Sequence, residues 1–177
     1  MQKDISDILL RYGIAVIAIT LSLLFPIFYF IFRPLTIMPV TWFLNLFYET
    51  NFTSLESLVI EGKEILFVDA CIGGSAYVLL LLLNLLTREI NLKKRIFLFL
   101  FGAFSLLILN IVRLIILVFL FLKDHLLFDL THKLFWYALS TIFVATIWLF
   151  SVKLFKIKAT PFISDLKFLF KKIKIKT

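Results

Sequence analysis

The chain has 177 residues, of which 62% are hydrophobic and 17% are charged, and its net charge is +8 at pH 7. This apolar fraction predicts a single integral membrane domain and excludes an ordinary soluble domain, while the placement of the positive charge beside apolar segments argues against nucleic-acid binding. A single cysteine excludes an internal disulfide, a CxxC redox pair and a cysteine-rich metal site.

Four segments are expected to span the membrane, since a spanning helix takes about 20 apolar residues. These segments are residues 9–32, 70–86, 96–122 and 134–152. Pro26 is expected to kink the first span near its far end. The apolar stretch at residues 35–48 is only 14 residues long, which predicts an interfacial or re-entrant helix.

A β-hairpin is predicted between the first two spans. Residues 52–60 and 63–69 are rich in Leu, Ile, Val, Phe and Thr, and Glu61 and Gly62 separate them. Glycine tolerates a positive φ, which a tight hairpin turn requires. The second strand would lead directly into the second span.

The distribution of charge predicts which loops lie in the cytoplasm. Residues 87–95 carry four basic residues against one acid, and the segment from Lys153 to Lys176 carries eight lysines against one acid. By the positive-inside rule both are expected to be cytoplasmic. Residues 34–69 hold five acids and one lysine, and residues 123–133 are balanced, so these are expected outside. The chain is therefore predicted to be an all-α, multi-pass plasma-membrane protein with both termini in the cytoplasm.

Two regions are expected along the chain, a membrane-embedded domain at residues 1–152 and a basic tail at residues 153–177. Apolar residues recur in the tail at helical spacing with lysines between them. This pattern is typical of an amphipathic helix lying on the inner leaflet of the bilayer. Anchoring is the main interpretation, and a regulatory or partner-binding role is the alternative.

Arg113 is the first candidate functional residue, because it is the only charge within residues 96–122. A charge at that depth costs about 2.5–3.5 kcal/mol on insertion scales, so an intramembrane arginine suggests a functional site. Asn110 precedes it by three positions, on the same helix face. The alternative is structural, with Arg113 and Asn110 hydrogen-bonding carbonyls of a neighbouring helix.

The predicted topology brings Cys71 and His132 to the same outer interface as Arg113. Cys71 would stand at the start of the second span, where free helical N–H groups and the helix dipole stabilise a thiolate. The glycines that follow would let another chain approach closely. Each residue also has an alternative interpretation without a catalytic role, in which Cys71 is a buried small hydrophobic residue and His132 caps a helix. His125 lies among loop charges and is expected to have no role.

Together the three side chains predict nucleophilic acyl transfer. His132 can take the proton of the Cys71 thiol and return it to a leaving amine. Arg113 can stabilise the oxyanion of a tetrahedral intermediate or bind a carboxylate or carbonyl of the substrate. The sequence holds no metal-ligand set and no cofactor motif, so neither is expected.

These residues resemble the exosortase/archaeosortase family. The resemblance rests on Asp69-Ala70-Cys71-Ile72-Gly73 after an extracellular hairpin, on Asn110-Ile111-Val112-Arg113 in a later apolar segment, and on His132 at the next helix start. It covers residues 52–149, with Ile72 where the family usually has serine, and with fewer spans than many members.

The resemblance implies a membrane cysteine transpeptidase. Such an enzyme cleaves C-terminal sorting signals of membrane-anchored precursor proteins at the outer face and passes the product to an acceptor, expected to be a lipid. Cys71 would be the nucleophile, and Arg113 and His132 its catalytic partners. Supporting or substrate-binding roles are expected for the neighbouring residues Asp69, Gly73, Gly74, Ser75 and Asn110.

Two other functions remain open from the sequence. In a non-enzymatic membrane scaffold or assembly subunit, Arg113 and Asn110 would bind a partner helix and Cys71 would serve packing. In a small transporter or channel subunit, Arg113 would be an anion or proton site.

Overall fold

The computed structural model describes residues 2–24, 26–87, 90–123, 127–135 and 140–157. These residues are mostly helical, with a small three-stranded sheet. The elements in chain order are α1 (Gln2–Leu24), α2 (Ile27–Leu44), β1 (Thr50–Phe52), β2 (Ser57–Ile60), β3 (Lys63–Leu66), α3 (Asp69–Ile72), α4 (Gly74–Leu86), α5 (Leu92–Leu122), α6 (Phe128–Leu134) and α7 (Ser140–Leu154).

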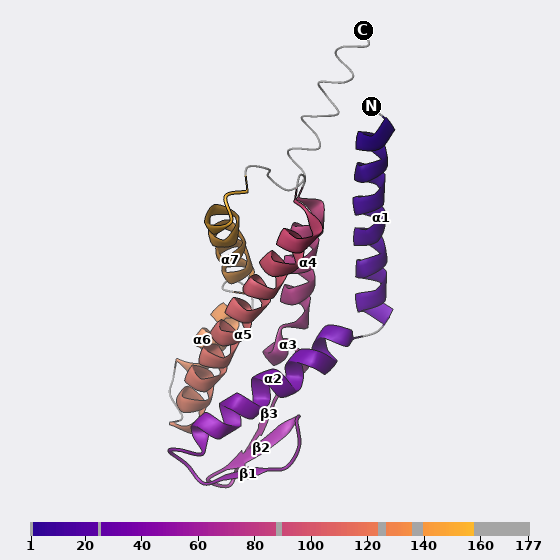
Figure 1. Cartoon of the computed structure of the whole chain (residues 1–177). Helices are drawn as coiled ribbons and strands as arrows, with labels where there is room; N and C mark the ends of the chain where they lie inside the picture. Colours follow the sequence, from indigo (N-terminus) through magenta and orange to yellow (C-terminus); the bar gives the residue numbers. More distant parts are fainter. Residues whose placement is uncertain (1, 25, 88–89, 124–126, 136–139, 158–177) are drawn as a thin grey trace.

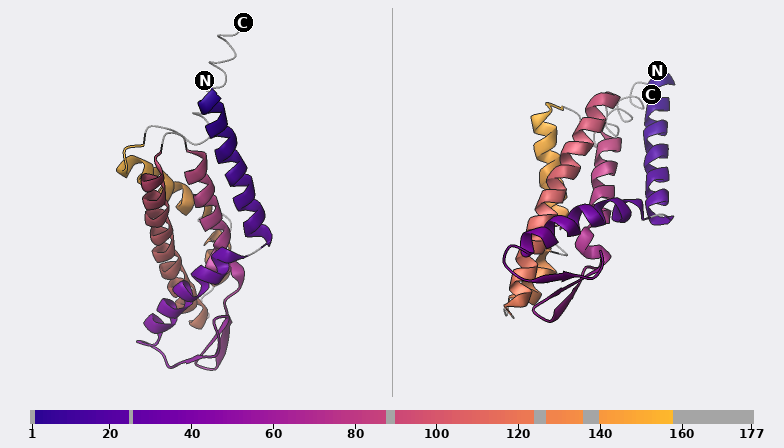
Figure 2. Two further views of the ribbon diagram at one scale, coloured as in Figure 1. Left: turned by 45° about the vertical axis from the view of Figure 1, so that its right-hand side comes forward. Right: turned by 60° about the horizontal axis from the view of Figure 1, so that its bottom comes forward.

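The helices α1, α4, α5 and α7 form a bundle in which each packs on the next (Figure 1). The sheet, α3, α6 and the C-terminal end of α5 lie together at one end of this bundle. Helix α2 does not follow the bundle direction. It runs across α4 and α5 at the end that carries the sheet, as both views of Figure 2 show.

Pro26 separates two helices instead of kinking one. Helix α1 ends at Leu24, Pro26 occupies the N-cap position of α2, and α2 begins at Ile27. Proline lacks an N–H and its ring clashes with a preceding helical turn, so it suits a helix start better than a helix interior. The expected single span at residues 9–32 is therefore wrong. The expected separate helix at residues 35–48 is instead the continuation of α2, with Pro34 and Pro39 inside it.

Two described helices, α2 and α5, are long and apolar enough to cross a membrane. The other apolar helices, Ile8–Ser22, Gly74–Leu86 and Thr141–Leu154, fall below the length that a full span takes. The expectation of four spans is therefore not supported. By length and composition, the two candidate spans give weak support for a membrane protein.

The expected hairpin is confirmed, with one further strand. Strands β2 and β3 pair antiparallel with Ile60 opposite Lys63. Glu61 and Gly62 connect them with φ angles of 50° and 76°. Positive φ at both central residues is the requirement of a type I′ hairpin turn, whose twist suits the flanking strands. The first strand begins at Ser57 instead of residue 52, and β1 adds a third strand on its other side.

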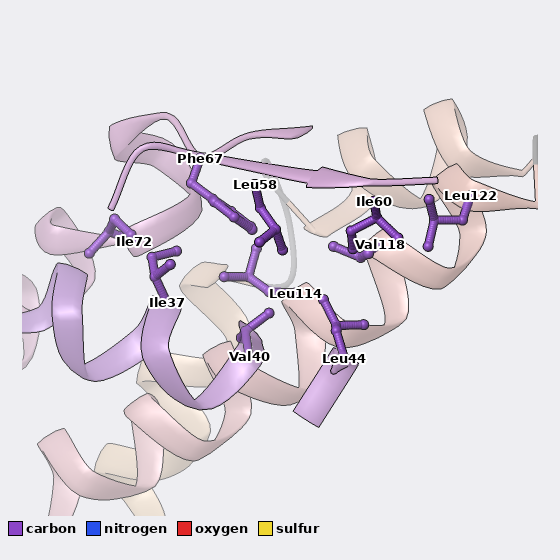
Figure 3. Close-up of a cluster of buried hydrophobic side chains, with 10 residues drawn as sticks. All are labelled: Ile37, Val40, Leu44, Leu58, Ile60, Phe67, Ile72, Leu114, Val118 and Leu122. Atoms are coloured by element: carbon purple, nitrogen blue, oxygen red, sulfur yellow. The ribbon is translucent and has the colours of Figure 1, made fainter. Parts of the chain in front are cut away.

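A buried apolar cluster joins the sheet to α2 and to the C-terminal half of α5 (Figure 3). It consists of Ile37, Val40, Leu44, Leu58, Ile60, Phe67, Ile72, Leu114, Val118 and Leu122. Because Leu114 neighbours Arg113 and Ile72 neighbours Cys71, this packing fixes the backbone on which both candidate residues stand. A second cluster, which includes Tyr77, Leu80, Leu106 and Trp148, holds α4, α5 and α7 together.

Two sequence predictions fall outside the described residues. His125 is one of them, and most of the expected amphipathic tail, residues 158–177, is the other.

Candidate functional site

Cys71 lies in a short helix that is separate from α4. Helix α3 ends at Ile72, and α4 begins at Gly74. Gly73 between them is the C-cap of α3, with a left-handed φ of 70° and ψ of 34°. Glycine adopts this conformation without the penalty that a Cβ brings, which is why it commonly ends helices. The Gly73 N–H donates to the Asp69 carbonyl at 3.1 Å and closes the turn. The apolar helix that was expected at residues 70–86 therefore starts at Gly74.

Gly74 allows close approach, but by a side chain of the same protein. A Cβ on Gly74 would lie 2.6 Å from two ring atoms of Tyr29 in α2. The glycine therefore lets α2 pack against the start of α4. Ser75, the next residue, is exposed.

Arg113 and Asn110 bind main-chain carbonyls of α3. Arg113 Nη2 donates to the carbonyl oxygens of Cys71 at 2.9 Å and Ala70 at 3.3 Å. Asn110 Nδ2 donates to those of Cys71 at 3.0 Å and Ile72 at 3.1 Å. Both side chains are buried. The last carbonyls of a helix have no partner within it, so these bonds supply donors that the short helix does not provide. Arg113 and Asn110 thus hydrogen-bond carbonyls of a neighbouring helix, as the structural alternative to a catalytic role proposed.

Cys71, Arg113 and His132 line one small cavity at the sheet end of the bundle, with a volume of about 10 Å³. Ala70, Leu117 and Phe135 complete its lining. The three candidate residues come from α3, the C-terminal half of α5 and α6, which lie toward the sheet end of the bundle in Figure 1. The fold therefore brings Arg113 close to Cys71, 42 positions earlier in the sequence, and to His132, 19 positions later, as expected from the sequence.

His132 lies within helix α6, Phe128–Leu134, four residues after its first residue instead of at a helix start. The imidazole stacks on the ring of Phe128, one helical turn earlier, with ring centroids 5.7 Å apart. This contact orients the imidazole from within its own helix, since residues four apart lie on one face.

The environment of the Cys71 thiol differs from the expected helix N-terminus. Helix α3 is only four residues long, and the Cys71 N–H already donates to the Val68 carbonyl at 2.8 Å. Burial raises the pKa of the Cys71 thiol, and the positive charge of Arg113 and a hydrogen bond with the Val68 backbone oppose that rise without cancelling it. The thiol is therefore protonated at neutral pH, and a reaction at its sulfur needs a base.

Arg33 is a charged residue of this region that the sequence analysis did not single out. Its guanidinium forms ion pairs with Glu56, at 2.5 Å, and with Asp69, the first residue of α3. It thereby ties α2 to the loop before β2 and to the helix that carries Cys71. Arg33 is the only charge between Arg11 and Glu49. The criterion that identified Arg113, an isolated charge in an apolar segment, would have identified it too.

No protein-family model, curated protein or solved structure matches this chain.

Proposed function

We propose that this chain is a membrane cysteine protease or transpeptidase of the exosortase/archaeosortase type. The observation that carries the proposal is the shared cavity lined by Cys71, Arg113 and His132. A thiol, a cation and an imidazole around one space are the groups that thiol-based acyl transfer requires.

In the proposed reaction, His132 accepts the proton of the Cys71 thiol while the sulfur attacks the scissile carbonyl carbon. A C–S bond forms and the carbonyl oxygen takes the negative charge, which the positive charge of Arg113 stabilises. Collapse of this intermediate breaks the C–N bond, and the leaving amine takes the proton from His132. An acceptor hydroxyl, amine or water then loses its proton to His132 and attacks the thioester. The C–S bond breaks and the thiol regains its proton.

The proposed substrate is a membrane-anchored precursor protein with a C-terminal sorting signal, cut at the outer face and transferred to a lipid acceptor. Large apolar side chains exposed on several helices support a setting within a bilayer, because such patches otherwise mark association sites. They include Leu10, Phe30, Trp42, Phe97, Phe104 and Leu149. The acidic sheet end and the basic start of α5 support a multi-pass arrangement with cytoplasmic termini and an extracellular site.

The alternative proposal is a non-enzymatic scaffold or assembly subunit. The bonds from Arg113 and Asn110 to the α3 carbonyls favour it, because they give both residues a structural role without any chemistry. In that case Cys71 would be a packing residue.

The deciding experiment compares cells that carry wild type, Cys71→Ser and Cys71→Ala. Proteomic analysis of new C-termini on membrane precursors reads out cleavage, and blotting of the membrane fraction reads out insertion. We expect both variants to insert at wild-type levels and to lose the new C-termini. Because Cys71→Ser keeps the size of the side chain, a scaffold would tolerate it. Unchanged C-termini in both variants would therefore contradict the enzyme.

A further inference from the structure

Strand β3 is the edge of the sheet nearest to Cys71. Within the described part of the chain the strand order is β1-β2-β3, so β3 has a strand neighbour on one side. The chain continues from Leu66 through Phe67 and Val68 into α3. A segment lying along β3 would therefore be led towards the Cys71 thiol.

The register shows which backbone groups of β3 face outward. The Phe67 N–H donates to the Glu56 carbonyl at 2.8 Å, so these two residues form a hydrogen-bonded pair. Such pairs alternate with non-bonded pairs along an antiparallel ladder. With Leu66 opposite Ser57 and Glu64 opposite Val59, the N–H and C=O groups of Leu66 and Glu64 point away from β2. Both residues are exposed.

An apolar groove with a volume of about 350 Å³ lies alongside this edge. The residues from Glu64 to Val68 form one wall, and Leu117 and Phe121 of α5 and Phe128 of α6 contribute to the rest. Cys71 and His132 line this groove and also the small cavity of the candidate site. The groove therefore borders the groups to which the proposed function assigns chemistry.

We propose that this groove binds an extended, apolar segment of the acyl-donor peptide, which adds to the sheet as a fourth strand along β3. A peptide strand matches the site in two respects, because its backbone can pair with Glu64 and Leu66 and its alternate side chains can enter the apolar groove. The inference rests on the proposed function for the position of the reacting carbonyl beside Cys71. Binding in the groove does not itself require the thiol.

The other possible occupants fit the groove less well. A lipid acyl chain can fill the apolar volume but cannot pair with the outward N–H and C=O groups of Glu64 and Leu66. A helical peptide has its backbone groups bonded internally. An extended peptide uses both the apolar wall and the edge backbone. The occupants also differ in how the loss of binding on backbone methylation would vary along a peptide.

The test measures binding of a fluorescein-labelled hexapeptide, with alternating leucine and threonine, to the full-length Cys71→Ala protein in detergent by fluorescence anisotropy. Six further peptides each carry one backbone N-methyl group, which removes one N–H. Because every second N–H of an added strand faces its neighbour, we expect methylation to weaken binding about three- to tenfold at alternate positions and less than about twofold between them. A flat profile, a period of three to four residues, or no binding up to about 1 mM would overturn the proposal.

A matched pair of protein variants tests the β3 side of the contact. Leu66→Pro removes the outward N–H, a change that edge strands tolerate, whereas Leu66→Ala keeps the N–H and shortens the side chain. We expect Leu66→Pro to bind the unmethylated peptide about three- to tenfold more weakly than Leu66→Ala, at matched unfolding temperatures. Equal affinities overturn the proposal. If Leu66→Pro unfolds, the N-methyl series decides alone.

Failure of this inference is distinguishable from failure of the proposed function. Binding is measured without the thiol, whereas cleavage is measured in cells with the wild-type chain. Periodic binding without cleavage would support the groove and contradict the enzyme. Cleavage with a flat methylation profile would support the enzyme and overturn strand addition.

Discussion

The Arg113 guanidinium donates a hydrogen bond to the main-chain carbonyl oxygen of Cys71 at 2.9 Å. This bond does not involve the Cys71 sulfur. The buried cation of α5 therefore fixes the backbone of the proposed nucleophile and also places a positive charge near its thiol. Stability and reactivity are coupled at this residue, so variants of Arg113 must be measured for both.

Removing Arg113 is expected to destabilise the protein. In Arg113→Ala the Cys71 carbonyl keeps its bond from Asn110, but the Ala70 carbonyl loses the donor at 3.3 Å. A hydrogen bond from a charged group contributes about 1.5–3 kcal/mol. We expect Arg113→Ala to lower the free energy of unfolding by about that amount in detergent, and Arg113→Lys to lower it less. Wild-type stability in Arg113→Ala would contradict the capping role.

The reactivity of Cys71 is expected to rise with pH through a midpoint above that of an ordinary thiol. Burial favours the neutral thiol and raises its pKa, and alkylation proceeds through the thiolate. Arg113→Gln removes a charge that lowers this pKa, so we expect its midpoint to move further up. The measurement is the rate of maleimide labelling between about pH 6 and 10. A wild-type midpoint below the ordinary range would contradict the dominance of burial.

The same pKa shift predicts how stability depends on pH. An acidic group whose pKa is higher in the folded state binds its proton more tightly there. The contribution of Cys71 to stability is therefore fully present below the unfolded-state pKa and is lost as pH rises from that value to the folded-state pKa. We expect the wild-type protein to lose stability over this interval relative to Cys71→Ala, as measured by thermal unfolding.

Gly74 is expected to tolerate no larger side chain. In Gly74→Ala the new Cβ would lie 2.6 Å from the Tyr29 ring, and overpacking of this kind costs about 1–3 kcal/mol. Gly13→Ala is the matched control, because a Cβ there meets nothing within 4 Å and alanine favours the interior of α1 by about 0.5–1 kcal/mol. We expect the unfolding temperature of Gly74→Ala to lie below that of wild type and the unfolding temperature of Gly13→Ala to lie above it. A neutral Gly74→Ala would contradict the close packing of α2 on α4.

Arg33 is expected to contribute little to stability but to be important for processing. Its partners Glu56 and Asp69 are exposed, and ion pairs of this kind contribute about 0–1 kcal/mol and weaken with salt. We expect Arg33→Gln to lower the unfolding temperature slightly at low salt and to reduce precursor cleavage in cells by loosening the start of α3. Glu56→Gln, which leaves the Asp69 pair in place, is the control and should retain more cleavage.

The hairpin and the meeting of the three candidate residues could be predicted from the sequence. Glu61-Gly62 between two β-rich segments specifies a tight turn. The charges of the loops predicted that Cys71, Arg113 and His132 would meet, although the four spans assumed in that prediction are not supported. The division of the apolar segment at Pro26 could not be predicted as readily, because apolar composition continues on both sides of it and proline is tolerated within spans.

The hydrogen-bond acceptors of Arg113 could not be predicted from the sequence either. Every residue carries a main-chain carbonyl, so nothing in the residue types distinguishes the carbonyls of Ala70 and Cys71 as acceptors. The left-handed turn at Gly73 leaves these carbonyls at the end of α3 and makes them available. Only the fold shows that Arg113 and Asn110 face them.

Lys63 gives the groove beside β3 one fixed end. Its ammonium donates to the Leu122 carbonyl at 3.3 Å and lies 6.0 Å from the centroid of the Phe121 ring, so the start of β3 is fastened to the last turn of α5. Cys71 lies at the opposite end of this strand. At that end Arg113 and Asn110 of α5 bind the main-chain carbonyl of Cys71, so β3 and α5 are fastened at both ends of the groove and its width is set before a segment binds.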